Sequence, residues 1–599
     1  MLSRFLSASI YFSLLLLLAT PFISSDRFVD NVLTPKLIWF GISVTLFSIA
    51  AFISFFVSKK DLKVRVDKID LWVILFFFYL HINHFFTDIS YYGSKISIST
   101  GCIIFYIILR ILLQQRTFDK IISLIIPLPY ILAGITSSIG LYQYFFLNPL
   151  ESELVIRVNM GNSGAVASYL SMLFPWLLLY VNTSKKSAIQ YLYRIIIALT
   201  VITIFFTQAR AAWIVLIASS LFILIYINRT KIKEIMSLYK KIKNIFLFVF
   251  MCLFLISGYL LFSLKKDSAN GRLFIWERTL EVFTDSPITG VGFQKFGSVY
   301  PLYQSKHLQQ NPQDSAMLLA NDINHAFNEY LHIAAELGSI GLFLFLGIFV
   351  YLGILFFKKK EQLETIELAS YAGVLSFLIL SFFTYPFKVF SIQFLVIGFI
   401  AIIVSKSKES NLFSIGKRGM TTVLGFSCLI LFFMSASELN RFKKEASWKE
   451  VYDHSHKLSW KTRARVYEKL YPIQQDNWDF LSIYGIELTI NKEYKKAIEV
   501  LELATKYMKT SDLYTHLGIS YEETGEYEKA RIAYETGIYM VPHKFFPKYR
   551  LVFLYRKMGL NAEAIALAKS MLTTTAKINS KAVIGIKYEI RKFLKQYDY

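Results

Sequence analysis

The residues best suited to chemistry lie in one polar interval, residues 270–341, between two long apolar stretches. They comprise an arginine, an indole, two turn glycines, two amides, an imidazole and a carboxylate, namely Arg272, Trp276, Gly290, Gly292, Asn324, His325, Asn328 and Glu329. An imidazole that titrates near pH 6.5 can accept a proton, and a carboxylate four residues away can orient it from the next turn of a helix. The spacing of His325 and Glu329 therefore predicts a proton-accepting pair at the start of a helix.

The first part of this interval predicts a short amphipathic helix followed by a turn, over residues 270–296. Arg272 and Trp276 are four residues apart and share a helix face. Pro287, Gly290 and Gly292 then form a tight bend in which the backbone can approach a ligand. The alternative is a re-entrant segment that rests on lipid headgroups.

Two further arginines precede the interval. Arg157 lies two residues before an Asn-Met-Gly-Asn-Ser-Gly turn, and Arg210 ends a loop of a few residues between two apolar stretches. An arginine this close to hydrocarbon costs several kcal/mol unless it snorkels, is paired or faces a wet cavity, so Arg210 is a functional candidate. The alternative is an anchor at the headgroup level.

These residues must be positioned by a membrane domain. The chain is 55% hydrophobic, which is more than a soluble globular protein needs, and the additional apolar residues are concentrated before residue 440. Apolar runs of about 17 to 25 residues are long enough to cross a bilayer as helices. The sequence predicts an all-α fold with a polytopic bundle of 12 to 13 spans in residues 1–440. The predicted spans are 5–24, 36–57, 71–86, 98–113, 121–147, 165–181, 193–207, 211–227, 246–264, 331–357, 368–384, 389–404 and 421–437.

The net charge of +23 arises from alternate loops of this bundle. The positive-inside rule makes these loops cytoplasmic, which explains the charge without a nucleic acid partner. It places the N-terminus inside, and the large loop 265–330 and the C-terminal domain outside. Because all three cysteines fall within apolar spans, we expect no disulfide framework in the exported parts.

Residues 441–599 carry an internal repeat and predict a soluble α-solenoid. Leu517, Gly518, Tyr521 and Ala530 fit the tetratricopeptide pattern, and related residues recur about 34 positions earlier and later. Small residues at these positions let the two helices of each pair touch. Such solenoids present a concave face to peptides or protein partners.

No spacing typical of a metal or nucleotide site is found in the sequence. It lacks a His-Glu-x-x-His motif, paired cysteines, an Asp-x-Asp pair and a phosphate-binding Gly-Lys loop. We therefore expect no metal and no cofactor, and the sequence argues against a metal-dependent nucleotide-sugar enzyme and against an ATPase.

The order of these motifs resembles the O-antigen ligase and polymerase family of bacterial inner-membrane glycosyltransferases. The resemblance covers residues 157–404 and includes the long external loop. It is carried by Arg157 and its Asn-rich turn, Thr207-x-x-Arg210, Arg272-x-x-x-Trp276, Pro287-x-x-Gly290-x-Gly292, Asn324-His325-x-x-Asn328 and Glu336-x-Gly338-x-x-Gly341. Family members often have a serine before the second arginine, where this chain has Gln208-Ala209.

The resemblance implies transfer of a glycan from undecaprenyl diphosphate to an acceptor hydroxyl on the periplasmic face. Arg157, Arg210 and Arg272 then bind the diphosphate, because the guanidinium fork matches phosphate oxygens. His325 is the general base with Glu329 as its orienting partner, and Trp276, Gly290, Gly292, Asn324 and Asn328 support the site. Direct attack inverts the anomeric carbon without a metal.

The acceptor stays open at this point. A sugar of the lipid A core implies a ligase, another lipid-linked glycan implies a polymerase, and a serine, threonine or tyrosine implies a protein transferase. The repeats mildly favour a protein acceptor or a protein complex. A different class is a flippase for the same lipids, in which the arginines line a path, and a third is a membrane-anchored scaffold.

Overall fold

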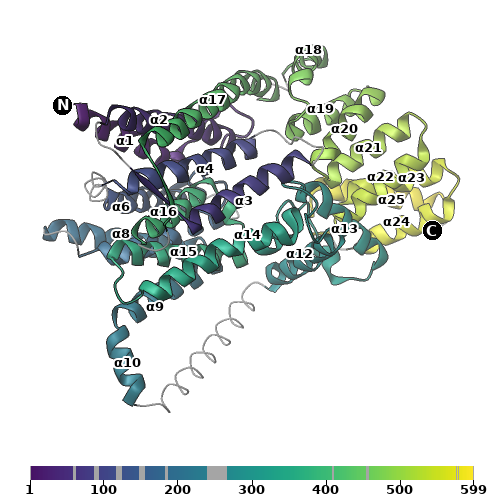
Figure 1. The fold of residues 1–599 in the computed structure, drawn as a ribbon. Coiled ribbons are helices and arrows are strands. Elements are labelled where there is room, and N and C mark those ends of the chain that lie inside the picture. The colour runs from purple at the N-terminus through teal and green to yellow at the C-terminus, as the bar shows by residue number, and fades with distance from the viewer. Residues whose placement is uncertain are drawn as a thin grey trace.

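The computed structural model describes residues 2–58, 63–86, 94–115, 125–147, 156–182, 186–238, 266–407, 411–453, 457–574, 576–577 and 579–597. Within these ranges the chain is almost entirely helical, which confirms the predicted all-α class. The span predicted at 246–264 lies outside the described residues. Figure 1 shows a bundle of long helices on one side and a curved array of short helix pairs on the other.

The bundle consists of helices that alternate direction across a common apolar core. They are α1 (Leu2–Leu18), α2 (Leu33–Val57), α3 (Lys68–Phe85), α4 (Ser94–Leu113), α6 (Leu128–Tyr142), α7 (Ser163–Tyr180), α8 (Ser187–Phe206), α9 (Arg210–Ile227), α14 (Glu329–Lys359), α15 (Thr365–Phe383), α16 (Phe390–Lys406) and α17 (Lys417–Asp453). Among the described residues, eight helices are long and apolar enough to cross a membrane, and three shorter apolar helices accompany them. The chain is a multi-pass membrane protein.

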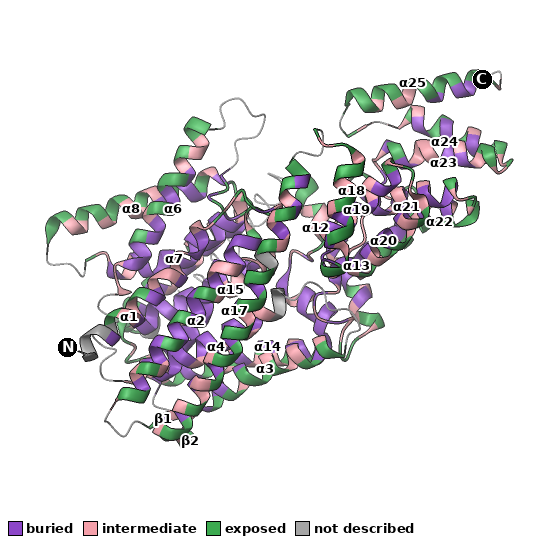
Figure 2. Cartoon of the chain, turned by 90° about the horizontal axis from the view of Figure 1, so that it is seen from above, coloured by how far each residue is buried: buried purple, intermediate pink, exposed green. Residues whose placement is uncertain are grey.

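The outer faces of these helices are as apolar as the inner ones. In α14, Phe345 and Leu352 are buried, whereas Phe343, Val350 and Phe357 on the other side are at least 63% exposed. Figure 2 shows the same division, with buried residues inside the bundle and exposed ones along the outer helices. In water such a surface is unfavourable, so these faces are suited to lipid.

The basic loops meet at one end of the bundle. Two of them form a small antiparallel ribbon of β1 (Val64–Asp67) and β2 (Asn411–Ile415), which the all-α prediction did not include. Helix α10 (Arg229–Leu238) is fixed there by Lys233, whose Nζ donates to Glu361 at 2.7 Å.

At the opposite end, α12 (Lys266–Asp285) and α13 (Phe296–Gln310) lie between the bundle and the helix array (Figure 1). Helix α12 is the amphipathic helix that the sequence predicts. A short 3-10 turn, Ser315–Leu318, follows α13 and leads toward α14.

The array contains three successive helix pairs that begin at Trp478, Ser511 and Phe545, at the repeat length of about 34 residues seen in the sequence. Gly485 and Gly518 allow the helices of a pair to touch, since a Cβ at either position would lie 2.5 Å from a partner side chain. The helices are α18 (Trp460–Leu470), α19 (Trp478–Ile490), α20 (Tyr494–Tyr507), α21 (Ser511–Glu523), α22 (Tyr527–Met540), α23 (Phe545–Lys557), α24 (Asn561–Thr573) and α25 (Lys581–Lys595). Their tetratricopeptide assignment stays a prediction.

Helix α17 joins the bundle to the array without a break. The boundary predicted at residue 440 falls inside this helix, and Trp448 and Val451 near its end are part of the array's own core. The array also docks on α13, where Gln304 Nε2 donates to the carbonyl of Met540 at 2.6 Å.

Candidate functional site

The start of α14 decides where the predicted imidazole lies. Asn328 is the N-cap, with an extended φ of −154° and a side chain that accepts a hydrogen bond from the backbone N–H of Leu331 at 3.1 Å. The helix therefore begins at Glu329, and His325 precedes it. The predicted His325–Glu329 pair on one helix face is wrong, because the two residues do not share a helix.

A different histidine and carboxylate form the pair on this helix. His332 Nε2 lies 3.4 Å from Glu336 Oε1, and both side chains are buried. The same carboxylate oxygen accepts from the backbone N–H of Phe296 at 3.2 Å. The sequence analysis missed this pair, although the four-residue spacing of His332 and Glu336 within the predicted helix is its signal.

The glycine bend closes against α14, not against a ligand. The N–H groups of Val291 and Gly292 each donate at 2.9 Å, to the carbonyls of Ala335 and Glu336 respectively. Gly290 has φ +70°, and a Cβ there would lie 2.3 Å from the carbonyl carbon of Glu336. Helix backbone therefore occupies the space next to Gly290, and the approach of this bend to a ligand stays a prediction.

The bend also breaks α14. Gly338 has φ +66° and non-helical geometry, and the N–H of the next residue, Ser339, donates to the carbonyl of Pro287 at 2.8 Å. Residues 329–337 therefore form a short helical segment of their own, which carries Glu329, His332 and Glu336 into the site.

Tyr385, in the turn between α15 and α16, links several site residues. Its ring centroid lies 4.6 Å from that of His325 and 5.3 Å from that of Phe327. Its hydroxyl accepts a hydrogen bond from Asn162 Nδ2 at 3.1 Å. The sequence analysis did not identify Tyr385, since its position in the short loop 384–389 carries no motif.

Arg272 and Arg210 lie close to this cluster. The Arg272 guanidinium donates to the carbonyl of Phe383 at 2.8 Å and sits 5.6 Å from the centre of the Phe327 ring. Burial, and next the positive charge of Arg210, lower the pKa of Arg272, whereas Tyr385 acts in the opposite direction. Two arginines that repel one another at this position favour binding of an anion between them.

Trp276 lies one turn from Arg272, and both side chains reach the end of α15. The Trp276 ring contacts Phe382 at 5.6 Å, next to the carbonyl of Phe383 that Arg272 binds. The two residues therefore face the same way, as their spacing predicts.

Arg157 is placed differently. Its side chain is exposed, and its backbone N–H donates to Gln143 Oε1 at 2.9 Å. The turn that it begins reaches the cluster through Asn162, which contacts Tyr385. The structure therefore brings Arg272 and His325 close to Tyr385, places Arg210 near Arg272, and gives Arg157 no described side-chain contact with them.

A cavity of about 380 Å³ opens between the bundle, α14 and the array, and it is referred to below as the site cavity. It is lined by three predicted residues, Asn324, His325 and Glu329. Further polar residues that line it include Asp30, Ser99, Gln294, His332, Glu336, Lys388, Gln393 and, from the array, Asp479. Lys388 adds a cation that the sequence analysis did not single out.

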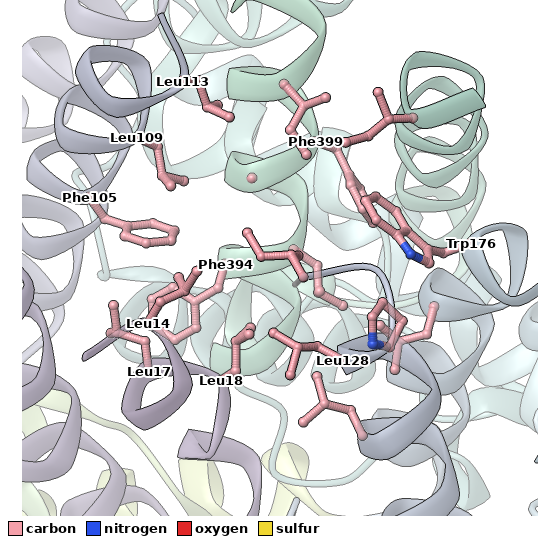
Figure 3. Close-up of a pocket in the computed structure, with 18 residues that line it drawn as sticks. Leu14, Leu17, Leu18, Phe105, Leu109, Leu113, Leu128, Trp176, Phe394 and Phe399 are labelled. Atoms are coloured by element: carbon pink, nitrogen blue, oxygen red, sulfur yellow. The ribbon is translucent and has the colours of Figure 1, made fainter. Parts of the chain in front are cut away.

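A second cavity of about 110 Å³ lies inside the bundle and is apolar throughout (Figure 3). Leu14, Phe105, Trp176 and Phe399 face it from four different helices. Its lining offers no charged side chain.

The site offers cations and proton acceptors in place of a metal-binding cluster. In the described parts of the chain, no group of three or more histidine, cysteine, aspartate or glutamate side chains is arranged to hold a metal ion. The available chemistry is anion binding by Arg210, Arg272 and Lys388, next to imidazole and carboxylate groups.

Comparison with known families bears directly on this arrangement. Residues 195–346 match the family model described as O-antigen ligase. This central segment is an O-antigen ligase domain. No curated protein matches the chain.

The O-antigen ligase match contains nearly all of the predicted site. Arg210, Arg272, His325 and Glu329 lie within it, whereas Arg157, Tyr385 and Lys388 lie outside. An O-antigen ligase domain indicates a membrane glycosyltransferase with a lipid-linked glycan and an acceptor as substrates.

Proposed function

We propose that this protein transfers a glycan from undecaprenyl diphosphate to an acceptor hydroxyl on the periplasmic face of the bacterial inner membrane. The main support is that Arg272 and His325 both lie near Tyr385, with Arg210 next to Arg272, and that these two arginines and the histidine belong to the segment that matches the O-antigen ligase family. The two arginines bind the diphosphate, and the imidazole faces the site cavity, where the acceptor enters.

The reaction is a single displacement at the anomeric carbon. The acceptor oxygen forms a bond to that carbon while the bond to the diphosphate oxygen breaks, and the hydroxyl proton passes to His325. Fixed cations stabilise the charge that grows on the leaving diphosphate. Attack from the face opposite the leaving group inverts the anomeric configuration.

The topology follows from charge. The basic loops form one end of the bundle, and the site and the array lie at the other. By the positive-inside rule the basic end is cytoplasmic, as is the N-terminus, and the site and array are periplasmic. The donor chemistry is the same for three acceptors. They are a sugar of the lipid A core in a ligase, a second lipid-linked glycan in a polymerase of the same family, and a protein hydroxyl in a protein transferase.

The test is transfer of a labelled glycan in membranes that carry wild-type protein or His325→Ala. Loss of a general base lowers the rate by about 10²- to 10⁴-fold. His543→Ala, a half-buried imidazole of the array that does not line the site cavity, is the matched control and should retain activity. Full transfer by the His325→Ala protein at normal expression contradicts the proposed mechanism.

A further inference from the structure

The helix array supplies one wall of the site cavity. Trp478 and Asp479, in the first turn of α19, line it together with Tyr507 and Met508 at the end of α20. His325, on the chain segment before α14, lines the same cavity from the membrane domain. Substrate that enters this cavity therefore meets both domains.

Direct contacts fix this wall of the cavity to the membrane domain. The backbone N–H of Lys509 donates to the carbonyl of Gly297 at 3.2 Å, and its Nζ donates to the carbonyl of Ser298 at 2.7 Å. Met508 packs so closely on Gly297 that a Cβ there would lie 2.5 Å from its sulfur. These contacts place the array's residues as a fixed part of the cavity.

Among the residues that the structure describes, one buried side-chain amide in the same cavity has no hydrogen-bond partner. Gln294 is 7% exposed, has φ +71°, and neither its Oε1 nor its Nε2 has a hydrogen-bond partner among the described residues. Leaving such a group unsatisfied costs about 1–3 kcal/mol. An amide that offers both a donor and an acceptor fits a ligand hydroxyl, which needs both.

We propose that Trp478, Asp479 and Gln294 form an acceptor subsite that binds a sugar ring and presents its hydroxyl to His325. This inference rests on the proposed function. It makes the array part of the substrate site, in addition to any role in binding partners.

The three side chains match the surfaces of a pyranose. An indole ring packs on the apolar face of the sugar, and a carboxylate and an amide bind its hydroxyl groups at the edge. The cavity volume lies within the range of about 300–1,000 Å³ for small-ligand sites. A peptide acceptor would need a groove or a free strand edge, and the described lining of the site cavity is helical and loop residues.

Binding can be measured apart from catalysis with the full-length protein in lipid nanodiscs. The probes are the methyl glycosides of glucose, galactose and N-acetylglucosamine, followed by saturation-transfer-difference NMR. We expect at least one glycoside to bind the wild type, and Trp478→Ala to bind it about tenfold more weakly, the size of a lost aromatic contact. Gln294→Ala should also weaken binding, and Trp478→Tyr should retain most of it.

The controls separate this subsite from the donor chemistry. Tyr588→Ala and Glu563→Gln change exposed residues of α25 and α24 and should bind as the wild type does. Arg272→Ala, which does not line the cavity, should lose transfer and keep glycoside binding. If the Arg272→Ala protein keeps both transfer and glycoside binding, the assignment of Arg272 to donor binding is wrong, and the proposed acceptor subsite is unaffected.

Three results would overturn the subsite. They are unchanged binding by Trp478→Ala and Gln294→Ala, no glycoside signal from the wild type, and displacement of the bound glycoside by a serine- and threonine-rich decapeptide acceptor. If Trp478→Ala does not fold, Trp478→Tyr and Gln294→Ala decide the question.

Discussion

The Tyr385 ring lies against the His325 imidazole, with 4.6 Å between centroids, while its hydroxyl accepts a hydrogen bond from Asn162 at the start of α7. Three segments that are distant in the sequence thus set the position of one imidazole. Tyr385 is a positioning residue for the proposed base.

Tyr385→Ala should lower transfer by roughly tenfold to a hundredfold, because the imidazole loses the ring that orients it. Tyr385→Phe keeps the ring and removes only the hydrogen bond to Asn162, so its loss should be smaller. The measurement is the initial rate of glycan transfer, together with its pH profile. Equal rates in all three proteins would show that Tyr385 does not orient His325.

Glycan transfer should depend on the shape of the cation at position 272 as well as on its charge. Arg272→Lys keeps the charge and loses the planar fork that matches phosphate oxygens, so we expect partial activity, with Arg272→Ala lower still. Arg194→Ala, an exposed arginine at the basic end, is the control and should be fully active. The same assay ranks the four proteins, and an Arg272→Ala protein as active as the control would exclude Arg272 from donor binding.

Gly290 should tolerate no side chain. A residue with a Cβ at φ +70° is strained by about 1–2 kcal/mol, and the clash with Glu336 adds to this. Gly290→Ala should therefore lower the thermal unfolding midpoint in detergent and reduce transfer, since His332 and Glu336 lie on the displaced segment. In Gly353→Ala a Cβ meets nothing within 4 Å, so this helix-interior control should be neutral or stabilised. If both variants behave alike, the close backbone contact does not exist.

Asp479 should make stability depend on pH. Burial, and next the charges of Asp30 and Glu445, raise the pKa of Asp479 from its ordinary value near 3.8 to about 7. Between these two values the folded protein holds a proton that the unfolded chain has lost. The contribution of Asp479 to the free energy of unfolding therefore falls as the pH rises from about 3.8 to about 7.

Asp479→Asn cannot ionise, so its stability relative to the wild type should increase from about pH 4 to pH 7 and stay constant above. Thermal unfolding midpoints of both proteins across this range provide the measurement. A difference that is flat with pH, or that narrows as pH rises, would contradict the raised pKa.

The parts of the fold that the sequence predicts depend on local pattern. Apolar runs of about 20 residues mark the spans, and the spacing of Arg272 and Trp276 marks one face of α12. The repeat near Gly518 marks the helix pairs. Each of these signals is contained within a few tens of residues.

The parts that the sequence analysis missed depend on contacts between distant segments. Nothing near Gly290 indicates that its partner is the backbone at Glu336, and nothing near Tyr385 indicates His325. The start of α14 is the exception. Asn328 before Glu329 is a local N-cap signal. An N-cap at Asn328 places the start of the helix at Glu329 and so excludes His325 from it.

The central claim is bond transfer from a lipid diphosphate at the arginine and imidazole site. Its most direct test is the purified protein in liposomes with a labelled undecaprenyl-diphosphate glycan and acceptor, with transferred product and leaflet exchange measured in the same sample. We predict a transferred product with inverted anomeric configuration, lost in both Arg272→Ala and His325→Ala. Leaflet exchange without product, or product that survives both substitutions, would contradict the account.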